Sequence, residues 1–176
     1  EVSRGLGDVY KRQAQQGACL HKGPLKRALK DEPRAFMSDR SAPTELLVLD
    51  VDGLRATPGD DLQAMADKIV LQLPSIFHNV SYIAQASASL GIKKDQVFLH
   101  LFFLLDMPVH PKTLKDYIRV INYECNFLAE QITLSANGQS LSYILDPSVA
   151  DNSKLIYLAP PKFIGVQDPY PDGRFV

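Results

Sequence analysis

The chain has 176 residues, 45% of them hydrophobic, and its formal net charge is −1. This length and composition predict a single domain with a hydrophobic core and exclude a low-complexity chain. The longest apolar run, residues 97–105, is far shorter than the ~20 residues of a membrane helix, so we expect a soluble, cytoplasmic protein with no membrane partner. Cys19 and Cys125 lack C-x-x-C spacing, and no disulfide is expected.

The amino-terminal part of the chain has two features of its own. Residues 1–40 hold nine Lys and Arg against five Asp and Glu, a small basic excess that would favour a nucleic-acid backbone but is also common in solvated tails. Residues 8–13, D-V-Y-K-R-Q, resemble the translation of an adapter used to make sequencing libraries. We therefore expect residues 1–13 to be an artefact, and residues 14–176 to be one domain truncated at both ends.

Two carboxylates end the first apolar stretch. In E-L-L-V-L-D-V-D-G-L, residues 45–54, the continuous apolar run predicts a strand that is buried on both faces. Asp50 and Asp52 share a face of that strand, with Cα atoms ~6.6 Å apart. Because paired carboxylates beside a core repel each other, they favour a bound cation such as Mg²⁺. The alternative is a hairpin turn at Asp52-Gly53 that leaves Asp50 solvated at the strand end.

Two amphipathic helices are predicted from apolar residues at helical spacing. The first covers residues 62–73, and either Asp60 or Asp61 is expected to cap it. The second covers about residues 114–128 and follows a turn that begins at Pro108. Both helices have one apolar face, so we expect them to pack on a sheet.

The remaining apolar segments predict strands. Alternation predicts one strand at about residues 80–87, and a run that is apolar on both faces predicts another at residues 97–105. His100 lies in the second strand, where a histidine more often forms a hydrogen bond in the core than binds a ligand. Asn137-Gly138 predicts a hairpin further along the chain.

A third carboxylate, Asp146, also follows an apolar stretch. Either it repeats the arrangement of the first strand, or it caps a turn that begins at Pro147 and Ser148. Residues 154–161 are expected to form a strand broken by prolines. Taken in order, the elements predict an α+β fold whose sheet is covered on one face by helices.

Three motifs in this order resemble the archaeo-eukaryotic primase superfamily, in particular the primase-polymerase domains of replication proteins from plasmids, prophages and integrative elements. The motifs are L-D-V-D-G at Asp50 and Asp52, F-L-H-L-F-F at His100, and I-L-D-P-S-V-A-D at Asp146. Their flanks, including S-A-S-L-G-I and K-L-I-Y-L-A-P-P, are similar too, so the resemblance covers residues 34–163. Phe98 departs from it, because the family often has a small or hydroxyl residue there.

The resemblance implies a primase-polymerase core with an RRM-like mixed or antiparallel sheet covered by helices. It implies template-directed nucleotidyl transfer that makes a primer on single-stranded DNA during replication of a mobile element, from nucleoside triphosphates, with two Mg²⁺ or Mn²⁺ ions. A helicase domain is common in full-length relatives. The implied metal ligands are Asp50, Asp52 and Asp146. The implied contacts to nucleotide phosphates are His100, Ser87, Ser89 and Lys154, with Lys93 and Lys94 as further candidates for the triphosphate or the template.

Two other functions fit part of the sequence. D-V-D-G-L after an apolar strand also resembles haloacid-dehalogenase-type phosphatases, in which Asp50 would be a nucleophile, but the stretches around His100 and Asp146 would have no role there. A non-catalytic primase-like module that binds nucleic acid is the second alternative.

Overall fold

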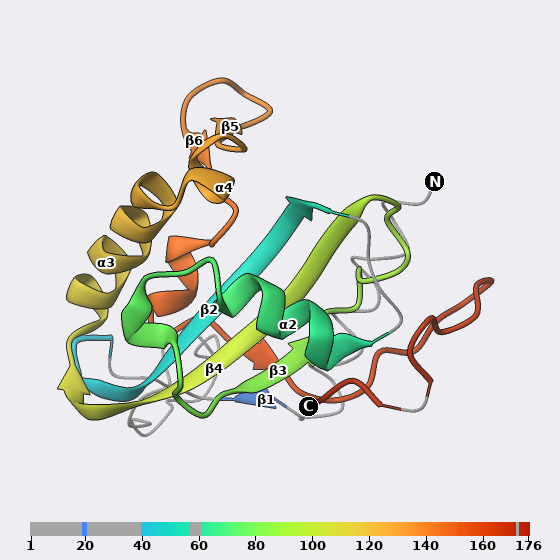
Figure 1. The fold of residues 1–176 in the computed structure, drawn as a ribbon, viewed down its shortest axis with the longest axis horizontal. Coiled ribbons are helices and arrows are strands. Elements are labelled where there is room, and N and C mark those ends of the chain that lie inside the picture. Colours follow the sequence, from blue (N-terminus) through green and yellow to red (C-terminus); the bar gives the residue numbers. More distant parts are fainter. Residues whose placement is uncertain (1–18, 21–39, 57–60, 172) are drawn as a thin grey trace, which may run out of the picture.

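The computed structural model describes residues 19–20, 40–56, 61–171 and 173–176 (Figure 1). The expected artefact at residues 1–13 lies outside the described residues. No helix within the described ranges is both long and apolar enough to cross a membrane. Cys125 is buried and forms no disulfide.

The centre of the fold is a three-stranded sheet in the order β2-β4-β3, and both pairings are antiparallel (Figure 1). This confirms the predicted combination of helices with an antiparallel sheet. Residues directly opposite each other in antiparallel strands share a face of the sheet. Asp50, His100 and Gln85 are aligned across the three strands and therefore form a polar row on one face. The strands are β2 (Thr44–Arg55), β3 (Ile83–Ala86) and β4 (Gln96–Val109).

Short extended segments cover both outer edges of this sheet. On the β2 side, Leu145 forms an antiparallel bridge with Val51. On the β3 side, Phe175 forms an antiparallel bridge with Gln85. Covered edges do not offer unpaired backbone groups to other chains. Two further strand pairs lie outside the sheet: β1 (Cys19–Leu20) with β7 (Ile156–Tyr157), and β5 (Thr133–Leu134) with β6 (Leu141–Ser142).

Both predicted helices are present with different bounds, because the first ends at Val70 and the second begins at Pro111. The Asp61 carboxylate accepts a hydrogen bond from the Ala64 amide at 3.1 Å, so Asp61 caps the first helix as predicted. The second predicted helix is interrupted at Cys125, whose ψ of 107° is extended. The helices are α2 (Leu62–Val70), α3 (Pro111–Glu124) and α4 (Asn126–Ala129), and the 3₁₀ turns are η2 (Ser75–Phe77) and η3 (Pro147–Ala150).

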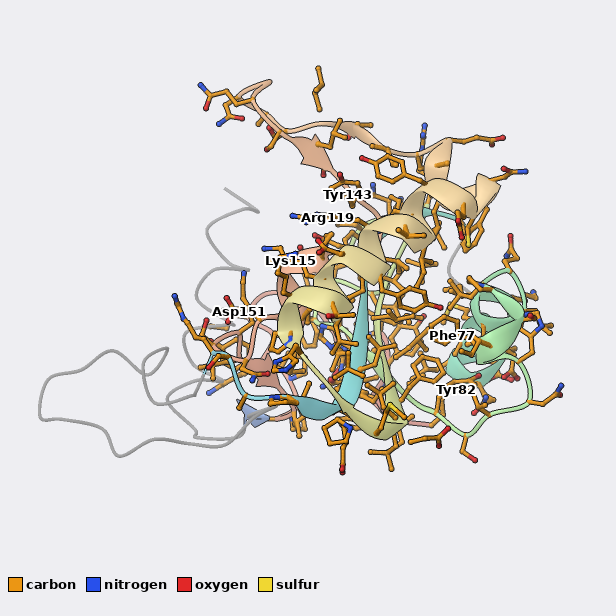
Figure 2. All side chains as sticks on the ribbon, turned by 90° about the vertical axis from the view of Figure 1, so that its left-hand side faces the viewer. Phe77, Tyr82, Lys115, Arg119, Tyr143 and Asp151 are labelled. Carbon is orange, nitrogen blue, oxygen red and sulfur yellow. The ribbon has the colours of Figure 1, made fainter. Side chains whose placement is uncertain are left out.

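Helix α2 and the turn η2 cover the face of the sheet that is opposite the polar row, whereas α3 lies beside β2 and packs against η3 (Figure 1). Leu49, Leu99 and Leu101 on that face are fully buried. The rings of Phe77 and Tyr82 pack against Phe103 on the same face, with ring centroids 5.0 and 5.7 Å away. Figure 2 shows Phe77 and Tyr82 on one side of the sheet and the segment that carries Asp151 on the other. The face with the polar row also holds buried Val48, Phe98 and Phe102, so the polar site lies beside apolar packing on that face.

The alternative prediction of a hairpin turn at Asp52-Gly53 is wrong. Strand β2 continues to Arg55, and its register with β4 shifts between Asp52 and Leu54. Gly53 has a φ of +82°, which glycine adopts without steric cost and which permits a bulge at this position. The bulge keeps Asp52 within the sheet instead of at a solvated turn.

Other segments also differ from the predicted boundaries. Strand β4 continues past Pro108, where a turn was predicted, because its far end still pairs with β2 at Val109. The strands predicted at residues 80–87 and 154–161 are shorter than expected, because they are limited to β3 and β7. The hairpin predicted at Asn137-Gly138 is confirmed as the β5–β6 pair.

Candidate active site

A pocket of about 220 Å³ lies on the face of the sheet that carries the polar row. Its walls come from β2, β3, β4, the segment around η3 and the segment around β7. The predicted metal ligands and the four predicted phosphate contacts line this pocket, whereas the further candidates Lys93 and Lys94 do not. The predicted residues that line it are Asp50, Asp52, Ser87, Ser89, His100, Asp146 and Lys154.

His100 is held between Asp50 and Gln85. The Gln85 amide group donates a hydrogen bond to the Tyr157 carbonyl at 2.9 Å, which directs Gln85 Oε1 toward His100 Nδ1 at 3.1 Å. Since Oε1 only accepts hydrogen bonds, Nδ1 carries a proton. The other ring nitrogen, Nε2, then faces Asp50 Oδ1 at 3.4 Å and pairs with it when the ring is protonated. The network thus fixes both the orientation and the tautomer of His100.

Asp146 reaches the pocket because of backbone pairing at the edge of β2. Its amide donates to the Asp50 carbonyl at 3.0 Å, and the Asp52 amide donates to the Ile144 carbonyl at 2.8 Å. Side chains alternate along an extended segment, so Leu145 points into the core while Asp146 lies on the face of Asp50 and Asp52. Because side chains alternate along this short segment, the Asp146 carboxylate lies on the same face of the sheet as the carboxylates of Asp50 and Asp52.

Buried Asn122 of α3 fixes this segment. Its side-chain NH₂ donates to the Leu145 carbonyl at 2.9 Å, and its Oδ1 accepts from the Leu145 amide at 3.0 Å. The NH₂ group also donates to the Ile118 carbonyl. Asn122 is completely buried, so its side chain replaces the missing strand partner of Leu145.

The Asp146 carboxylate is oriented by Ser148. The Ser148 amide donates to Oδ1 at 2.8 Å and the Ser148 hydroxyl donates to Oδ2 at 2.6 Å. The interpretation from the sequence that Asp146 caps the turn at Pro147 and Ser148 is therefore correct. Capping and lining the pocket are compatible, because each carboxylate oxygen can accept more than one bond.

The Asp52 carboxylate lies where negative charge accumulates. Although Asp52 is exposed at the mouth of the pocket, partial loss of hydration raises its pKa above the usual value. The Lys93 cation opposes this shift, and the negative charge of Asp146 adds to it. A bound cation would relieve the repulsion between the two carboxylates.

The residues fit a divalent metal in their chemistry. Carboxylate oxygens are preferred ligands of Mg²⁺ and Mn²⁺, and the pocket wall provides three carboxylates. Within the part of the chain that the structure describes, however, no three His, Cys, Asp or Glu side chains are close enough together to hold a metal ion. Binding would therefore require the carboxylates of Asp50, Asp52 and Asp146 to turn toward one another.

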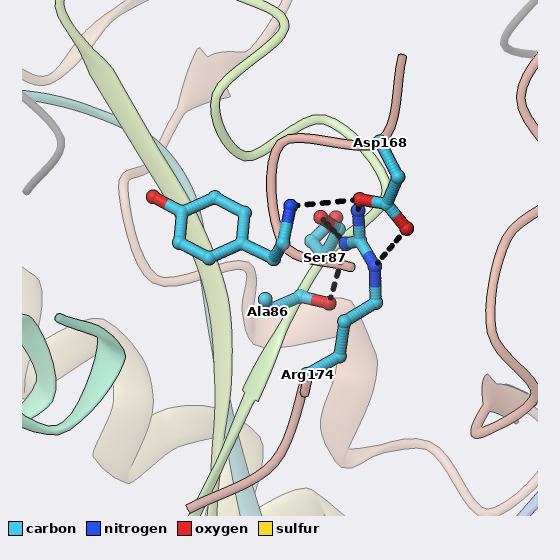
Figure 3. Close-up of polar contacts among 5 residues, drawn as sticks. Ala86, Ser87, Asp168 and Arg174 are labelled. Carbon is cyan, nitrogen blue, oxygen red and sulfur yellow. Dashed lines mark hydrogen bonds and ion pairs between the residues drawn. The ribbon is translucent and has the colours of Figure 1, made fainter. Parts of the chain in front are cut away.

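The loop with Ser87 and Ser89 is held from behind by the carboxyl-terminal segment. Arg174 is buried, forms an ion pair with Asp168, and donates to the carbonyls of Ala86 and Ser87 (Figure 3). Its bond to the Ser87 carbonyl is 3.0 Å long. Since these carbonyls are occupied on the far side of the loop, the position of the serines at the pocket wall is fixed.

Gln85, Asn122 and Ser148 were missed as site residues by the sequence reasoning. Gln85 could have been found, because it is the only polar residue of a short apolar strand and aligns with His100. Asn122 is a single polar residue on the apolar face of α3. The sequence shows that both residues are polar among apolar neighbours, but it points to the site only once the pairing of the strands is known.

Comparison with known proteins gave no relatives. No protein-family model matches the chain, and neither a curated protein nor a solved structure is significantly similar to it.

The raised pKa of Asp52 predicts the sign of one stability effect. A carboxyl group with a higher pKa in the folded state binds its proton more tightly there, so unfolding becomes easier as the pH rises through that pKa. Asp52→Asn should therefore raise the melting temperature at pH 7 and raise it less at pH 4, measured by thermal unfolding without divalent ions. An equal gain at both pH values, or a loss at pH 7, would contradict this explanation.

The Asn122 contacts predict a large loss of stability. Asn122→Ala leaves the buried amide and carbonyl of Leu145 without these bonds, and each buried unpaired group costs about 1–3 kcal/mol. We expect a loss of about 2–4 kcal/mol in chemical denaturation. The control Asn126→Ala, at an exposed position of α4, should change stability by less than about 0.5 kcal/mol. Equal losses in both variants would refute the role of Asn122.

Proposed function

We propose that this chain is a primase-polymerase catalytic domain that makes primers on a single-stranded DNA template. One observation supports the proposal most strongly. Asp50 and Asp52 of β2, His100 of β4 and Asp146 before η3 come from three separate segments of the chain and line one pocket. These are the four positions that carry the resemblance to the archaeo-eukaryotic primase superfamily. The antiparallel sheet, with α2 on the opposite face, is compatible with the RRM-like core implied by that resemblance.

The carboxylates of Asp50, Asp52 and Asp146 would hold two Mg²⁺ or Mn²⁺ ions. Bound there, these ions would neutralise the triphosphate and make the attacking 3′-hydroxyl more acidic. The protein itself supplies the framework: β2 presents two of the carboxylates, and the segment clamped by Asn122 presents the third.

His100 would donate a hydrogen bond to a phosphate oxygen of the incoming nucleotide. Its Nδ1 proton is engaged by Gln85, so the contact to the substrate would be made by Nε2, which faces Asp50 Oδ1 in the structure. A protonated ring that donates to a phosphate forms a charge-assisted bond, which is stronger than a neutral one. Ser87 and Ser89 would add hydroxyl donors and Lys154 a cation, and all three line the same pocket.

The wider setting of the proposal follows from the same resemblance. The substrates would be nucleoside triphosphates and single-stranded DNA, and the process would be replication of a mobile element in the cytoplasm. Residues 14–176 would then be the catalytic domain, and a helicase domain is a further partner that the resemblance suggests.

The alternative functions receive less support. A haloacid-dehalogenase-type phosphatase would place Asp50 on a strand of a parallel Rossmann-like sheet, whereas β2 pairs antiparallel with β4. A non-catalytic nucleic-acid-binding module would have no need for the three acids and His100 in one pocket. Incorporation of labelled nucleotide separates these functions from the proposed one.

Loss of either Asp50 or Asp146 should abolish primer synthesis. Asp50→Ala and Asp146→Ala each remove a metal ligand, and we expect nucleotide incorporation to fall by about 10²-fold or more, because charge stabilisation of this kind typically contributes that much. Incorporation of labelled nucleotide on single-stranded DNA with Mg²⁺ or Mn²⁺ measures this, and chelation by EDTA should have the same effect. Asp106→Ala, an exposed carboxylate outside the pocket, is the matched control. Wild-type rates in Asp50→Ala would remove the assignment.

Loss of His100 should weaken nucleotide use more than metal binding. A hydrogen bond to a charged group contributes about 1.5–3 kcal/mol, so His100→Ala should raise the nucleotide KM by about tenfold or more. Steady-state kinetics at varied nucleotide concentration, together with Mn²⁺ titration, measures both properties. An unchanged KM would count against the proposed contact.

A further inference from the structure

A second cavity of about 420 Å³ lies beside the pocket, and none of the roles above uses it. We call it the basic groove. Its walls come from the bulged end of β2, the turn before β4, and the chain around the β5–β6 hairpin. The side chains that matter below are Asp52, Arg55, Lys93, Phe98, Gln131 and Tyr143.

The charge of the basic groove suits an anion. Arg55 and Lys93 contribute two cations, and Asp52 is the only acid among the described residues that line it. The side-chain amide of Gln96 adds a neutral hydrogen-bonding group to the same wall, while that of Gln131 is bonded to the Arg55 amide and the Phe127 carbonyl. Cations with polar groups at their side are typical of surfaces that follow a phosphate backbone.

An aromatic ring is held in place at the same groove. Tyr143 lines it, and its hydroxyl shares a hydrogen bond of 2.7 Å with the Tyr123 hydroxyl of α3. The two rings also meet edge to face, with centroids 5.8 Å apart. Figure 2 shows Tyr143 near one end of α3. Such a ring beside cations can stack with a nucleic-acid base, whatever its sequence.

The pocket and the basic groove share two residues. Asp52 and Phe98 line both, whereas Asp50 lines only the pocket and Arg55 only the groove. Lys93 Nζ lies 4.8 Å from the centre of the Phe98 ring and so is close to this boundary. Nucleotidyl transfer joins two substrates at one reacting phosphate, so their sites must meet at the carboxylates that support the reaction. The shared position of Asp52 meets that requirement.

We propose that the basic groove binds the phosphate backbone of the DNA strand whose 3′-hydroxyl attacks the nucleotide, a role that rests on the proposed function. The strand end would lie at Asp52 and the triphosphate in the pocket. The 3′-oxygen forms a bond to the α-phosphorus, the bond from that phosphorus to the pyrophosphate oxygen breaks, pyrophosphate leaves, and the hydroxyl proton passes to solvent.

The test separates strand binding from catalysis. Fluorescence anisotropy of a labelled single-stranded oligonucleotide, without nucleotide or divalent ions, measures strand affinity directly. Arg55→Ala and Lys93→Ala should each weaken binding by about five- to tenfold, and each should lower the dependence of log K on log salt by ~0.7. The nucleotide KM of Arg55→Ala should stay at the wild-type value, because Arg55 does not line the pocket.

Two lysines provide matched controls. Lys94 is adjacent to Lys93 and carries the same charge, but it does not line the groove, so Lys94→Ala should weaken binding less than Lys93→Ala. Lys68 lies on α2, which covers the other face of the sheet, and Lys68→Ala should bind as the wild type does.

The outcomes distinguish the two proposals. Wild-type strand affinity in both Arg55→Ala and Lys93→Ala would overturn the groove assignment, as would no binding by the wild-type protein. Incorporation of nucleotide by the wild type in that case would leave the proposed function intact. A raised nucleotide KM in Arg55→Ala with unchanged strand affinity would also overturn the groove assignment, because the groove would then be part of the nucleotide site. Strand binding through the groove without any incorporation would instead remove the proposed function.

Discussion

The candidate site depends on the backbone pairing between the outer edge of β2 and the short segment that ends at Asp146. The Asp146 amide bonds to the Asp50 carbonyl, so the third carboxylate is fixed relative to the other two by main chain and not by flexible side chains. The clamp by Asn122 ties this segment to α3, whose buried residues belong to the hydrophobic core. Packing of the core and placement of the carboxylates are thus linked through one buried amide side chain.

This arrangement concentrates negative charge on one face of a sheet whose other face is apolar. The raised pKa of Asp52, caused first by lost hydration and also by the charge of Asp146, is the physical sign of that concentration. Lys93 offsets part of it within the protein, and a divalent cation would offset the rest. The same charges favour an anionic ligand only when cations accompany it.

Much of the site could be predicted from the sequence, because alternation along a strand is a local property. Asp50 and Asp52 could be assigned to one face before any pairing was known, and the motif order then added His100. The extension of β2 past Gly53 could not be predicted, because Asp-Gly is compatible with a turn and with a bulge, and only the pairing with β4 decides between them. The convergence of Asp146 and the role of Asn122 likewise depend on contacts between distant segments, which leave no periodic pattern in the sequence.

The central claim is that Asp50, Asp52 and Asp146 act together on divalent cations. Binding of Mn²⁺, followed by the electron paramagnetic resonance signal of the free ion in the presence of a non-hydrolysable nucleotide, tests it most directly. The account predicts that the wild type binds two ions per chain, that Asp146→Ala loses most of this binding, and that its fold is retained in circular dichroism. Binding by Asp146→Ala that equals the wild type would contradict the account.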